Sequence, residues 1–192
     1  MTTPMTQDDV LNLFRESGAL LEGHFKLSSG LHSDRYLQSA LVLQHPDYAQ
    51  QLGAALGARL AHLDPTVVLS PALGGIVIGQ EVGRALHIRA IFAERQDGKL
   101  SLRRGFTLSP SDRVVVIEDV ITTGLSTRET CEVAEGSGAR VLGAGSIVDR
   151  GTDATRLSIP LQSLVRMAVA AYKPEECPMC AAGSPVAKPG SR

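Results

Sequence analysis

The sequence has 192 residues, of which 43% are hydrophobic and 20% are charged, and its formal net charge is −1. This size and composition suit one globular domain with an apolar core, while the small net charge gives no general attraction to nucleic acid or to an anionic membrane. The absence of Trp and the aromatic content of 4% argue against a base-stacking surface for single-stranded nucleic acid.

The N-terminus and the cysteines indicate the compartment. Asp8 and Asp9 lie where a signal peptide would need its apolar run. Arg166 interrupts the apolar stretch Leu164–Ala171, and no apolar stretch is long enough to span a bilayer. The three cysteines are an odd number and do not make a disulfide framework. We therefore expect a cytoplasmic protein that has neither a membrane nor a nucleic acid as its partner.

In the first third of the chain, helical and extended segments alternate. Thr6–Asp9 resembles a capping box, and apolar residues follow it at helical spacing up to a predicted end near Gly18. The Gly/Ser-rich segment Gly23–Gln38 predicts a turn between short strands. Pro46–His62 predicts a second helix, because proline suits a first helical turn and one face of the segment stays apolar.

From Thr66 onward, apolar strands alternate with helical segments. The predicted strands are Thr66–Ser70, Ala90–Ala93, Arg113–Ile117 and Val141–Val148, and the predicted helices are Val77–Leu86 and Ser126–Glu135. Strands that are apolar on both faces and separated by helices indicate an α/β fold with a mostly parallel sheet. Beyond Tyr172 the chain is rich in Pro, Gly and Ala, which predicts irregular structure.

The segment after the strand Arg113–Ile117 is the most informative part of the sequence. Glu118 and Asp119 follow this strand directly, and the hydroxyl-rich loop Thr122–Thr127 then opens a helix. In an open parallel sheet, ligands bind at the carboxyl ends of the strands, and the amides of a helix N-terminus attract anions. Gly124 lets the backbone approach a ligand closely. The segment therefore predicts a phosphate cradle beside two carboxylates, which would hold ribose hydroxyls directly or through Mg²⁺.

Other interpretations of this loop are less suited to its residues. It lacks the Gly-Lys-Ser/Thr ending of a Walker loop, and it does not match GxGxxG. The plain structural alternative is a tight turn between a strand and a helix, with a solvated acidic pair. Two adjacent acids directly after an apolar strand argue against that alternative, because burying them costs stability unless a ligand compensates them.

With its apolar run, two acids, two apolar residues and Thr-x-Gly, the segment Val114–Thr127 resembles the phosphoribosyl pyrophosphate signature of type I phosphoribosyltransferases. The resemblance implies that family's fold, a central, mostly parallel sheet flanked by helices with a small N-terminal hood. It implies catalytic roles for Lys99, Glu118 and Asp119. The donor contacts that it implies are Arg95, Lys99, Arg103, Glu118, Asp119, Val120, Ile121, Thr122, Thr123, Gly124, Leu125 and Ser126.

Three other stretches resemble the orotate-specific members of that family. Gly23–Gly30 with Tyr36-Leu37 is similar to the hood segment that lies over orotate. Pro71–Ile76 is similar to the loop that receives pyrophosphate, and Val148–Arg150 is similar to the end of the last core strand, where the family places an arginine on orotate. The orotate contacts that the resemblance implies are Lys26, Tyr36, Leu37, Thr122 and Arg150.

Arg150 suits this role chemically, because its planar guanidinium matches the carboxylate of orotate. The structural alternative is an ordinary ion pair with Asp149 or Asp153. Taken without the other stretches, the residue would favour that alternative as much as a substrate contact.

The segment Glu94–Gly105 concentrates basic residues in a predicted flexible hairpin, namely Arg95, Lys99, Arg103 and Arg104. A solvated charged loop is the plain interpretation. In the family, however, a loop at this point closes over the active site, usually that of the other subunit in a dimer, which would exclude water and place cations on the leaving pyrophosphate. The sequence departs from positions that are often Lys or His in the family at Ser28, Gly74, Gln96 and Ser101, with Lys26 as a possible substitute near Ser28.

The resemblance as a whole implies orotate phosphoribosyltransferase activity with Mg²⁺ as cofactor and a homodimer in which loop 95–105 reaches the other subunit's site. We expect one domain over residues 1–192, with a hood mainly from 1–40 plus the C-terminal segment and a core at about 45–172. A phosphoribosyltransferase for another base is one alternative, and the hood segment and Arg150 argue against it. The other is a non-catalytic sensor of phosphoribosyl pyrophosphate that binds nucleic acid, against which the net charge of −1 argues.

The cysteines and histidines carry no further function in this interpretation. Cys177 and Cys180 supply two ligands where structural zinc needs four, and no His or other Cys lies near them in the sequence, so we expect no zinc site. Cys131 is expected in the core of a helix layer. The histidines show no spacing typical of acid–base catalysis, and His24 and His32 are the two that we consider for contact with the ligand.

Overall fold

A computed structural model describes residues 4–27, 29–151 and 157–189 of the chain. Its centre is a six-stranded sheet with the strand order β5-β4-β3-β6-β7-β8. The strands are β3 (Val67–Pro71), β4 (Arg89–Gln96), β5 (Lys99–Leu102), β6 (Arg113–Ile121), β7 (Arg140–Asp149) and β8 (Leu161–Arg166). Strand β5 is antiparallel to β4, and the other neighbouring pairs are parallel. The expected α/β fold is confirmed, with β8 as an edge strand that the sequence pattern did not predict.

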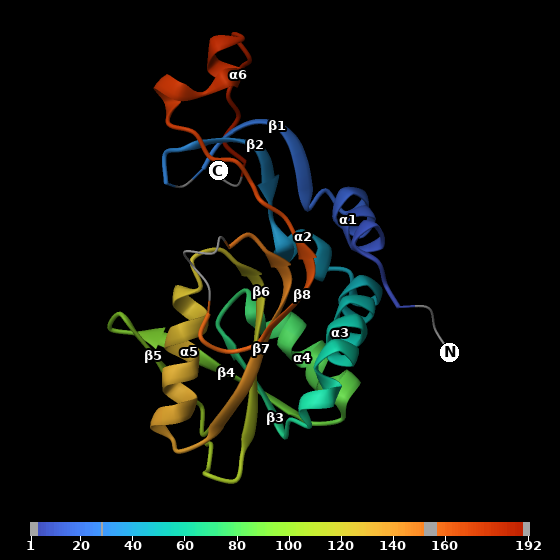
Figure 1. The fold of residues 1–192 in the computed structure, drawn as a ribbon, viewed down its shortest axis with the longest axis vertical. Coiled ribbons are helices and arrows are strands. Elements are labelled where there is room, and N and C mark those ends of the chain that lie inside the picture. Colours follow the sequence, from blue (N-terminus) through green and yellow to red (C-terminus); the bar gives the residue numbers. More distant parts are fainter. Residues whose placement is uncertain (1–3, 28, 152–156, 190–192) are drawn as a thin grey trace.

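Helices cover both faces of this sheet (Figure 1). They are α1 (Gln7–Glu16), α2 (Ser39–Leu43), α3 (Pro46–Leu60), α4 (Gly75–Leu86) and α5 (Leu125–Gly136). Helices α3 and α4 pack on one face of the sheet and α5 packs on the other. The predicted capping box begins α1, where the Thr6 side chain accepts a hydrogen bond from the Asp9 amide and the Asp9 carboxylate accepts one from the Thr6 amide. Within the described residues, no helix is both long and apolar enough to cross a membrane.

Strand β6 has two apolar cores, one on each side, because successive side chains of a strand point to opposite faces of the sheet. Ile117 belongs to the core that includes residues of α3 and α4, and Val116 belongs to the core that includes residues of α5. The same alternation directs Glu118 toward the α5 side and Asp119 toward the α3–α4 side. The fold thus sends two adjacent acids to different faces of one sheet.

Strand β6 is also longer than the sequence pattern predicted. It continues beyond Ile117 to Ile121, so both acids lie inside the strand rather than after it. Pairing with β7 extends it, since Val120 lies opposite Val148 and Ile121 lies opposite Asp149. Backbone pairing with β7 therefore continues the strand through the two acids to the apolar pair Val120 and Ile121.

A second, smaller sheet lies beside the carboxyl end of the main sheet, at the top of Figure 1. It is the antiparallel hairpin of β1 (Leu20–Lys26) and β2 (His32–Leu37). The C-terminal tail flanks both of its edges, because the His32 amide donates to the Tyr172 carbonyl and the Lys26 amide donates to the Ala187 carbonyl, each at 2.8 Å. We call β1, β2 and residues 172–189 the hairpin lobe. The prediction of an irregular tail was wrong in part, since the tail contains the 3₁₀ helix η3 (Pro174–Glu176) and the short helix α6 (Pro178–Ala181).

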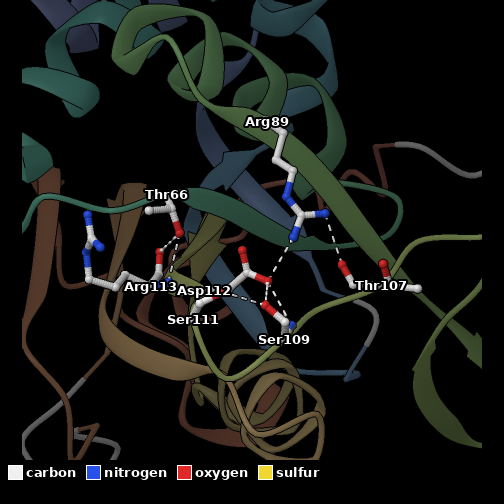
Figure 2. Close-up of polar contacts among 7 residues, drawn as sticks. All are labelled: Thr66, Arg89, Thr107, Ser109, Ser111, Asp112 and Arg113. Carbon is white, nitrogen blue, oxygen red and sulfur yellow. Dashed lines mark hydrogen bonds and ion pairs between the residues drawn. The ribbon is translucent and has the colours of Figure 1, made fainter.

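At the opposite, amino-terminal edge of the main sheet, polar groups satisfy one another (Figure 2). The Asp112 carboxylate accepts hydrogen bonds from the Arg89 guanidinium at 3.0 Å and from the Ser109 amide at 2.7 Å. The Thr66 hydroxyl accepts one from the Arg113 amide at 2.9 Å. These contacts join the starts of β3, β4 and β6, and they place a closed polar network at the edge that faces away from the hairpin lobe.

Candidate active site

Two cavities meet the carboxyl end of β6, one on each side of the sheet. Glu118 lines a small cavity of about 160 Å³, and the other residues around it are Val120, Ile121, Thr122, Thr123, Gly124, Leu125, Ser126 and Thr127. Asp119 lines a larger cavity of about 380 Å³, whose other residues are Gln38, Ala40, Leu43, Gln44, Leu73, Gly74 and Val77. The acids that the sequence placed together therefore belong to adjoining cavities that open from the same end of one strand.

Both acids lie in surroundings that favour their neutral form. The Glu118 side chain is almost buried, and this burial, together with the nearby Asp119 carboxylate, raises the pKa of Glu118 to about 8. Burial also raises the pKa of Asp119, although its hydrogen bond with the backbone of Val120 opposes the shift. A buried carboxylate is stabilised by hydroxyl donors or by a cation. The strand end is therefore a site that gains stability when a polyhydroxyl or cationic ligand binds.

The loop of the small cavity has the form that the sequence predicted for an anion site. Gly124 has φ of +70° and caps α5, a helix of 12 residues. Residues of the first turn of α5 line the cavity, so it lies at a helix N-terminus, where the helix dipole attracts negative charge. The side chains of Thr122 and Thr123 are exposed, so their hydroxyls are available to a ligand. The arrangement suits a phosphate group.

One residue at this loop was missed by the sequence reasoning. The Arg128 guanidinium donates to the Thr123 carbonyl at 3.0 Å, and the Arg128 amide donates to the Gly124 carbonyl at 2.9 Å. Arg128 therefore holds the loop backbone and adds a positive charge one turn inside α5. Its position four residues after Gly124 was the available signal, because residues four apart lie one above the other on a helix.

The loop Pro71–Ile76 connects β3 to α4 beside Asp119. The peptide between Ala72 and Leu73 is cis, and the Leu73 side chain is 83% exposed. A Cβ atom added to Gly74 would lie 2.7 Å from Asp119 Oδ1. Gly74 therefore packs directly against the Asp119 carboxylate, and a larger residue at this position would require that carboxylate to move.

Arg150 follows β7 and lies next to the end of β6. Its amide donates to the Ile121 carbonyl at 2.8 Å, which places it beside Thr122, the residue that the resemblance assigns to both substrates. Burial lowers the pKa of Arg150, and within the described part of the chain its Nε atom is buried without a hydrogen-bond partner. A buried guanidinium nitrogen without a partner is costly. Arg150 therefore needs an acceptor from outside the described residues.

The structural alternative for Arg150 was an ion pair with a neighbouring aspartate. Asp149 instead lies 3.8 Å from the Arg166 guanidinium and accepts a hydrogen bond from the Gly151 amide at 2.8 Å. Asp153, the other aspartate considered, lies outside the described residues. Among the described ion pairs, Asp149 is thus engaged with groups other than the Arg150 guanidinium.

The other predicted orotate contacts lie on the hairpin lobe. Tyr36 and Leu37 are half-buried at the end of β2, where the Tyr36 ring packs against Phe25 with ring centroids 6.0 Å apart. Gln38, the next residue, lines the Asp119 cavity. Lys26 is exposed at the end of β1. Ser28, one of the departures from the family, lies outside the described residues.

The predicted basic hairpin is confirmed as a hairpin of β4 and β5, with Asp97 and Gly98 at positive φ in its turn. Arg95 forms an ion pair with Glu129 on α5. The Arg104 guanidinium donates two hydrogen bonds to the Glu94 carboxylate, both at 2.8 Å. Lys99 and Arg103 are exposed. Such surface ion pairs contribute only about 0–1 kcal/mol, so a bound phosphate group could replace a carboxylate as the partner.

Comparison with known proteins gives full-length likenesses. The chain is 51% identical to the orotate phosphoribosyltransferase of Pelotomaculum thermopropionicum over 188 residues, covering 98% of this chain and 99% of that protein. It is 50% identical to that of Heliobacterium modesticaldum over 190 residues, covering 98% and 100%. The crystal structure of orotate phosphoribosyltransferase from Aeropyrum pernix matches with a TM-score of 0.69 at 26% identity, covering 82% of this chain and 93% of that chain. No protein-family model matches the chain.

Proposed function

The chain belongs to the orotate phosphoribosyltransferase family, and from this premise we propose how its site carries out that family's reaction. The reaction transfers the phosphoribosyl group of phosphoribosyl pyrophosphate to orotate, giving orotidine 5′-monophosphate and pyrophosphate, a step in the synthesis of pyrimidine nucleotides. The single observation that carries the proposal is the end of β6, where a hydroxyl-lined cavity at a helix N-terminus adjoins the buried carboxyl of Glu118 and the half-buried carboxyl of Asp119.

In this proposal, the donor binds across the two cavities of β6. The 5′-phosphate binds in the 160 Å³ cavity, where the loop Thr122–Ser126 offers amides and hydroxyls. Glu118 and Asp119 accept hydrogen bonds from the ribose hydroxyls, which would offset the cost of burying the two carboxylates. The pyrophosphate extends toward the loop Pro71–Ile76, on the Asp119 side.

Orotate binds beside the ribose, near the ends of β6 and β7. Arg150 holds the orotate carboxylate, because its buried Nε atom lacks an acceptor among the described residues and a carboxylate supplies one. Thr122 lies on the same side and contacts both substrates. The hairpin lobe covers the base with Lys26, Tyr36 and Leu37. From Leu37 the chain continues through Gln38, which lines the larger cavity.

The chemistry needs no side-chain nucleophile. The orotate nitrogen attacks the anomeric carbon of ribose as pyrophosphate leaves, through an oxocarbenium-like state. The protein contributes by holding the two reactants in line and by stabilising the charge of the leaving group. Glu118 and Asp119 fix the ribose, and Lys99 at the tip of the β4–β5 hairpin neutralises the departing pyrophosphate.

The carboxylate oxygens at the end of β6 are the kind of ligand that Mg²⁺ prefers. We propose that Mg²⁺ binds mainly through the donor's oxygens, with Asp119 as its contact on the protein. When bound, the ion would supply positive charge to the pyrophosphate. The raised pKa of the Asp119 carboxyl, caused by burial, fits this assignment, since a nearby cation would offset that burial.

The expectations of one domain, a homodimer and a cytoplasmic location remain part of the proposal. In the dimer, loop 95–105 reaches the other subunit's site. The Arg95–Glu129 ion pair holds the hairpin against its own α5. A weak surface pair of this kind is easily exchanged, which would let the hairpin leave that position when donor binds next to it.

The experiment that tests the function follows the absorbance of orotate with phosphoribosyl pyrophosphate and Mg²⁺, in parallel with hypoxanthine, adenine and uracil. We expect orotate to be consumed only when both donor and metal are present, with the other bases inert. Turnover of another base would replace the proposed acceptor. No turnover with any base, despite tight donor binding, would favour a sensor of the donor.

Arg150 provides the residue-level test of the acceptor site. We expect Arg150→Ala to raise KM for orotate at least tenfold, about 1.4 kcal/mol or more, while KM for the donor stays near the wild-type value. Arg140→Ala is the matched control, because Arg140 lies exposed at the opposite end of β7. An unchanged KM for orotate in Arg150→Ala would remove Arg150 from the acceptor site.

A further inference from the structure

The hairpin lobe contains a cluster of four potential metal ligands far from β6. His24 comes from β1, His32 begins β2, and Cys177 and Cys180 come from the start of α6 in the C-terminal tail. Their ligand atoms all lie within 4.8 Å of one another. The sequence reasoning dismissed zinc because Cys177 and Cys180 had no histidine near them in the sequence. The fold supplies two histidines from about 150 residues earlier, so that expectation needs to be replaced.

The distances within the cluster are close to those of a tetrahedral metal site. His24 Nε2 lies 2.8 Å from His32 Nδ1 and 3.6 Å from each of the two cysteine Sγ atoms, and Cys180 Sγ lies 3.2 Å from His32 Nδ1. Tetrahedral zinc with Zn–N near 2.0–2.1 Å and Zn–S near 2.3 Å separates its ligand atoms by about 3.3–3.8 Å. Changes of up to about one ångström in these separations would therefore bring the four atoms onto one ion.

The ring of His24 is already oriented for coordination. Its Nδ1 atom lies 2.9 Å from the Ser184 carbonyl oxygen, which can only accept, so Nδ1 carries the proton and donates. The lone pair of the neutral ring is then on Nε2, the atom that faces the cluster. A carbonyl that accepts a hydrogen bond from the other ring nitrogen, and so fixes the tautomer, is typical of metal-binding histidines. Ser184 thus does for His24 what a ligand-orienting residue does in a metal centre.

The centre of the lobe is polar where a core would be apolar. His24 is 5% exposed, His32 is 6% exposed and Cys177 is 3% exposed. Small structural units that bury few apolar side chains commonly depend on a metal or on disulfides. Thiols are weak hydrogen-bond donors and acceptors, so two imidazoles and two thiols that face one another gain little from direct contact, whereas one cation would bind a lone pair of each.

We propose that His24, His32, Cys177 and Cys180 bind one structural Zn²⁺ ion, which fastens the C-terminal tail to the β1–β2 hairpin. Two cysteines and two histidines at tetrahedral spacing select zinc among the divalent metals. Four protein ligands complete the coordination shell and leave no position for water or substrate, so the ion holds structure and takes no part in catalysis. The proposal does not depend on the activity proposed for the β6 site.

The ion also connects to the rest of the molecule. The tail that carries Cys177 and Cys180 pairs with both edges of the hairpin, at Tyr172 and at Ala187. Strand β2, which begins with His32, ends one residue before Gln38 in the wall of the larger cavity. Zinc would thus fix the position of the strand that leads to this cavity.

The primary test is the metal content of the full-length protein, produced without a metal-binding tag and dialysed against a mild chelator. We expect about one zinc per chain in the wild type and in Cys131→Ser, since Cys131 lies on α5 and outside the cluster. Cys180→Ser should lose the zinc, whereas Cys180→His, which restores a ligand, should retain it. Cys180 is the exposed member of the cluster, so these changes spare the buried packing.

Two further measurements make the outcome decisive. Replacement by Co²⁺ should give the visible absorption of a tetrahedral thiolate site in the wild type and Cys131→Ser but not in Cys180→Ser. Removing zinc with a strong chelator should increase hydrogen exchange in β1, β2 and residues 172–189 while β6 and α5 remain protected. Wild-type protein without stoichiometric zinc, with another metal in its place, or with Cys177 and Cys180 joined in a disulfide would overturn the proposal.

Discussion

The two ends of strand β6 carry carboxylates in opposite surroundings. Asp112, just before the strand, accepts hydrogen bonds from Arg89 and Ser109, which lower its pKa although burial alone would raise it. Glu118, near the other end, is buried beside another acid, and its pKa rises to about 8. The carboxylate at one edge of the sheet is stabilised by groups of the protein itself. The carboxyl group at the other edge has no such partner among the described residues and would be stabilised by a ligand.

The contrast separates residues that stabilise the fold from residues that we propose bind substrate. At the amino-terminal edge, a network among strand starts and loops is complete without any ligand (Figure 2). At the carboxyl edge, burial without compensation costs folding free energy, which binding can return. Substitutions at the two ends of β6 should therefore change activity and stability in opposite ways.

The largest effect is expected at Asp119. Asp119→Asn should lower kcat/KM by about 100-fold or more, corresponding to roughly 2.7 kcal/mol of lost transition-state stabilisation. The reason is that the amide can neither hold a cation nor accept ribose hydroxyl protons as well as a carboxylate. Steady-state kinetics and a thermal melt of the same preparation provide the measurement. Lower activity accompanied by a lower melting temperature would mean that Asp119 supports the fold instead.

The next effect concerns the hairpin that lies beyond the carboxyl edge. Lys99→Ala should lower kcat by about 10–100-fold without changing stability, because Lys99 is exposed and its charge acts on the leaving group. Mixed dimers of Lys99→Ala and Asp119→Asn subunits should regain activity if each hairpin serves the other subunit's site. Mixed dimers as inactive as either parent would restrict the hairpin to its own subunit.

A smaller effect of opposite sign is expected for stability at Glu118. Because folding raises the pKa of Glu118, the native state loses stability as pH rises from about 4.5 toward about 8. Glu118→Gln removes this charge and should increase the free energy of unfolding by roughly 1–3 kcal/mol at pH 8–9. The gain should vanish below pH 4.5, where the wild-type carboxyl is neutral in both states. Denaturant unfolding at several pH values, without Mg²⁺, measures this, and a stability gain that does not depend on pH would contradict the buried-charge explanation.

The smallest effect is expected at Asp112. Asp112→Asn should decrease the free energy of unfolding by about 1–2 kcal/mol at neutral pH, since it weakens charge-assisted hydrogen bonds from Arg89 and Ser109. Folding lowers the pKa of Asp112, so this contribution is lost as pH falls through the native-state pKa, and wild type and variant should converge in acid. Catalysis should stay at the wild-type level. A loss of turnover in Asp112→Asn would contradict the claim that the amino-terminal edge of the sheet contributes to stability and not to catalysis.

Much of the phosphate site could be read from the sequence because its signals are local. The apolar run, the acids Glu118 and Asp119, and Gly124 before a helix lie within a dozen residues, so strand, loop and helix dipole follow from short-range rules. The capping box at Thr6 and the basic β4–β5 hairpin were predictable for the same reason. The strand end at Ile121 was not, because pairing with β7 carries β6 past the two acids that interrupt its apolar run.

The sequence by itself determined the α/β class, the order of the main elements and the segment proposed to cradle phosphate, since each is encoded by periodicity and turn residues over short stretches. Only the tertiary structure placed Glu118 and Asp119 in separate cavities and brought Gly74 against Asp119. It also gathered His24 and Cys177 from 153 residues apart. Such meetings depend on the strand order and on how the tail packs against the hairpin, and no local pattern of residues records them.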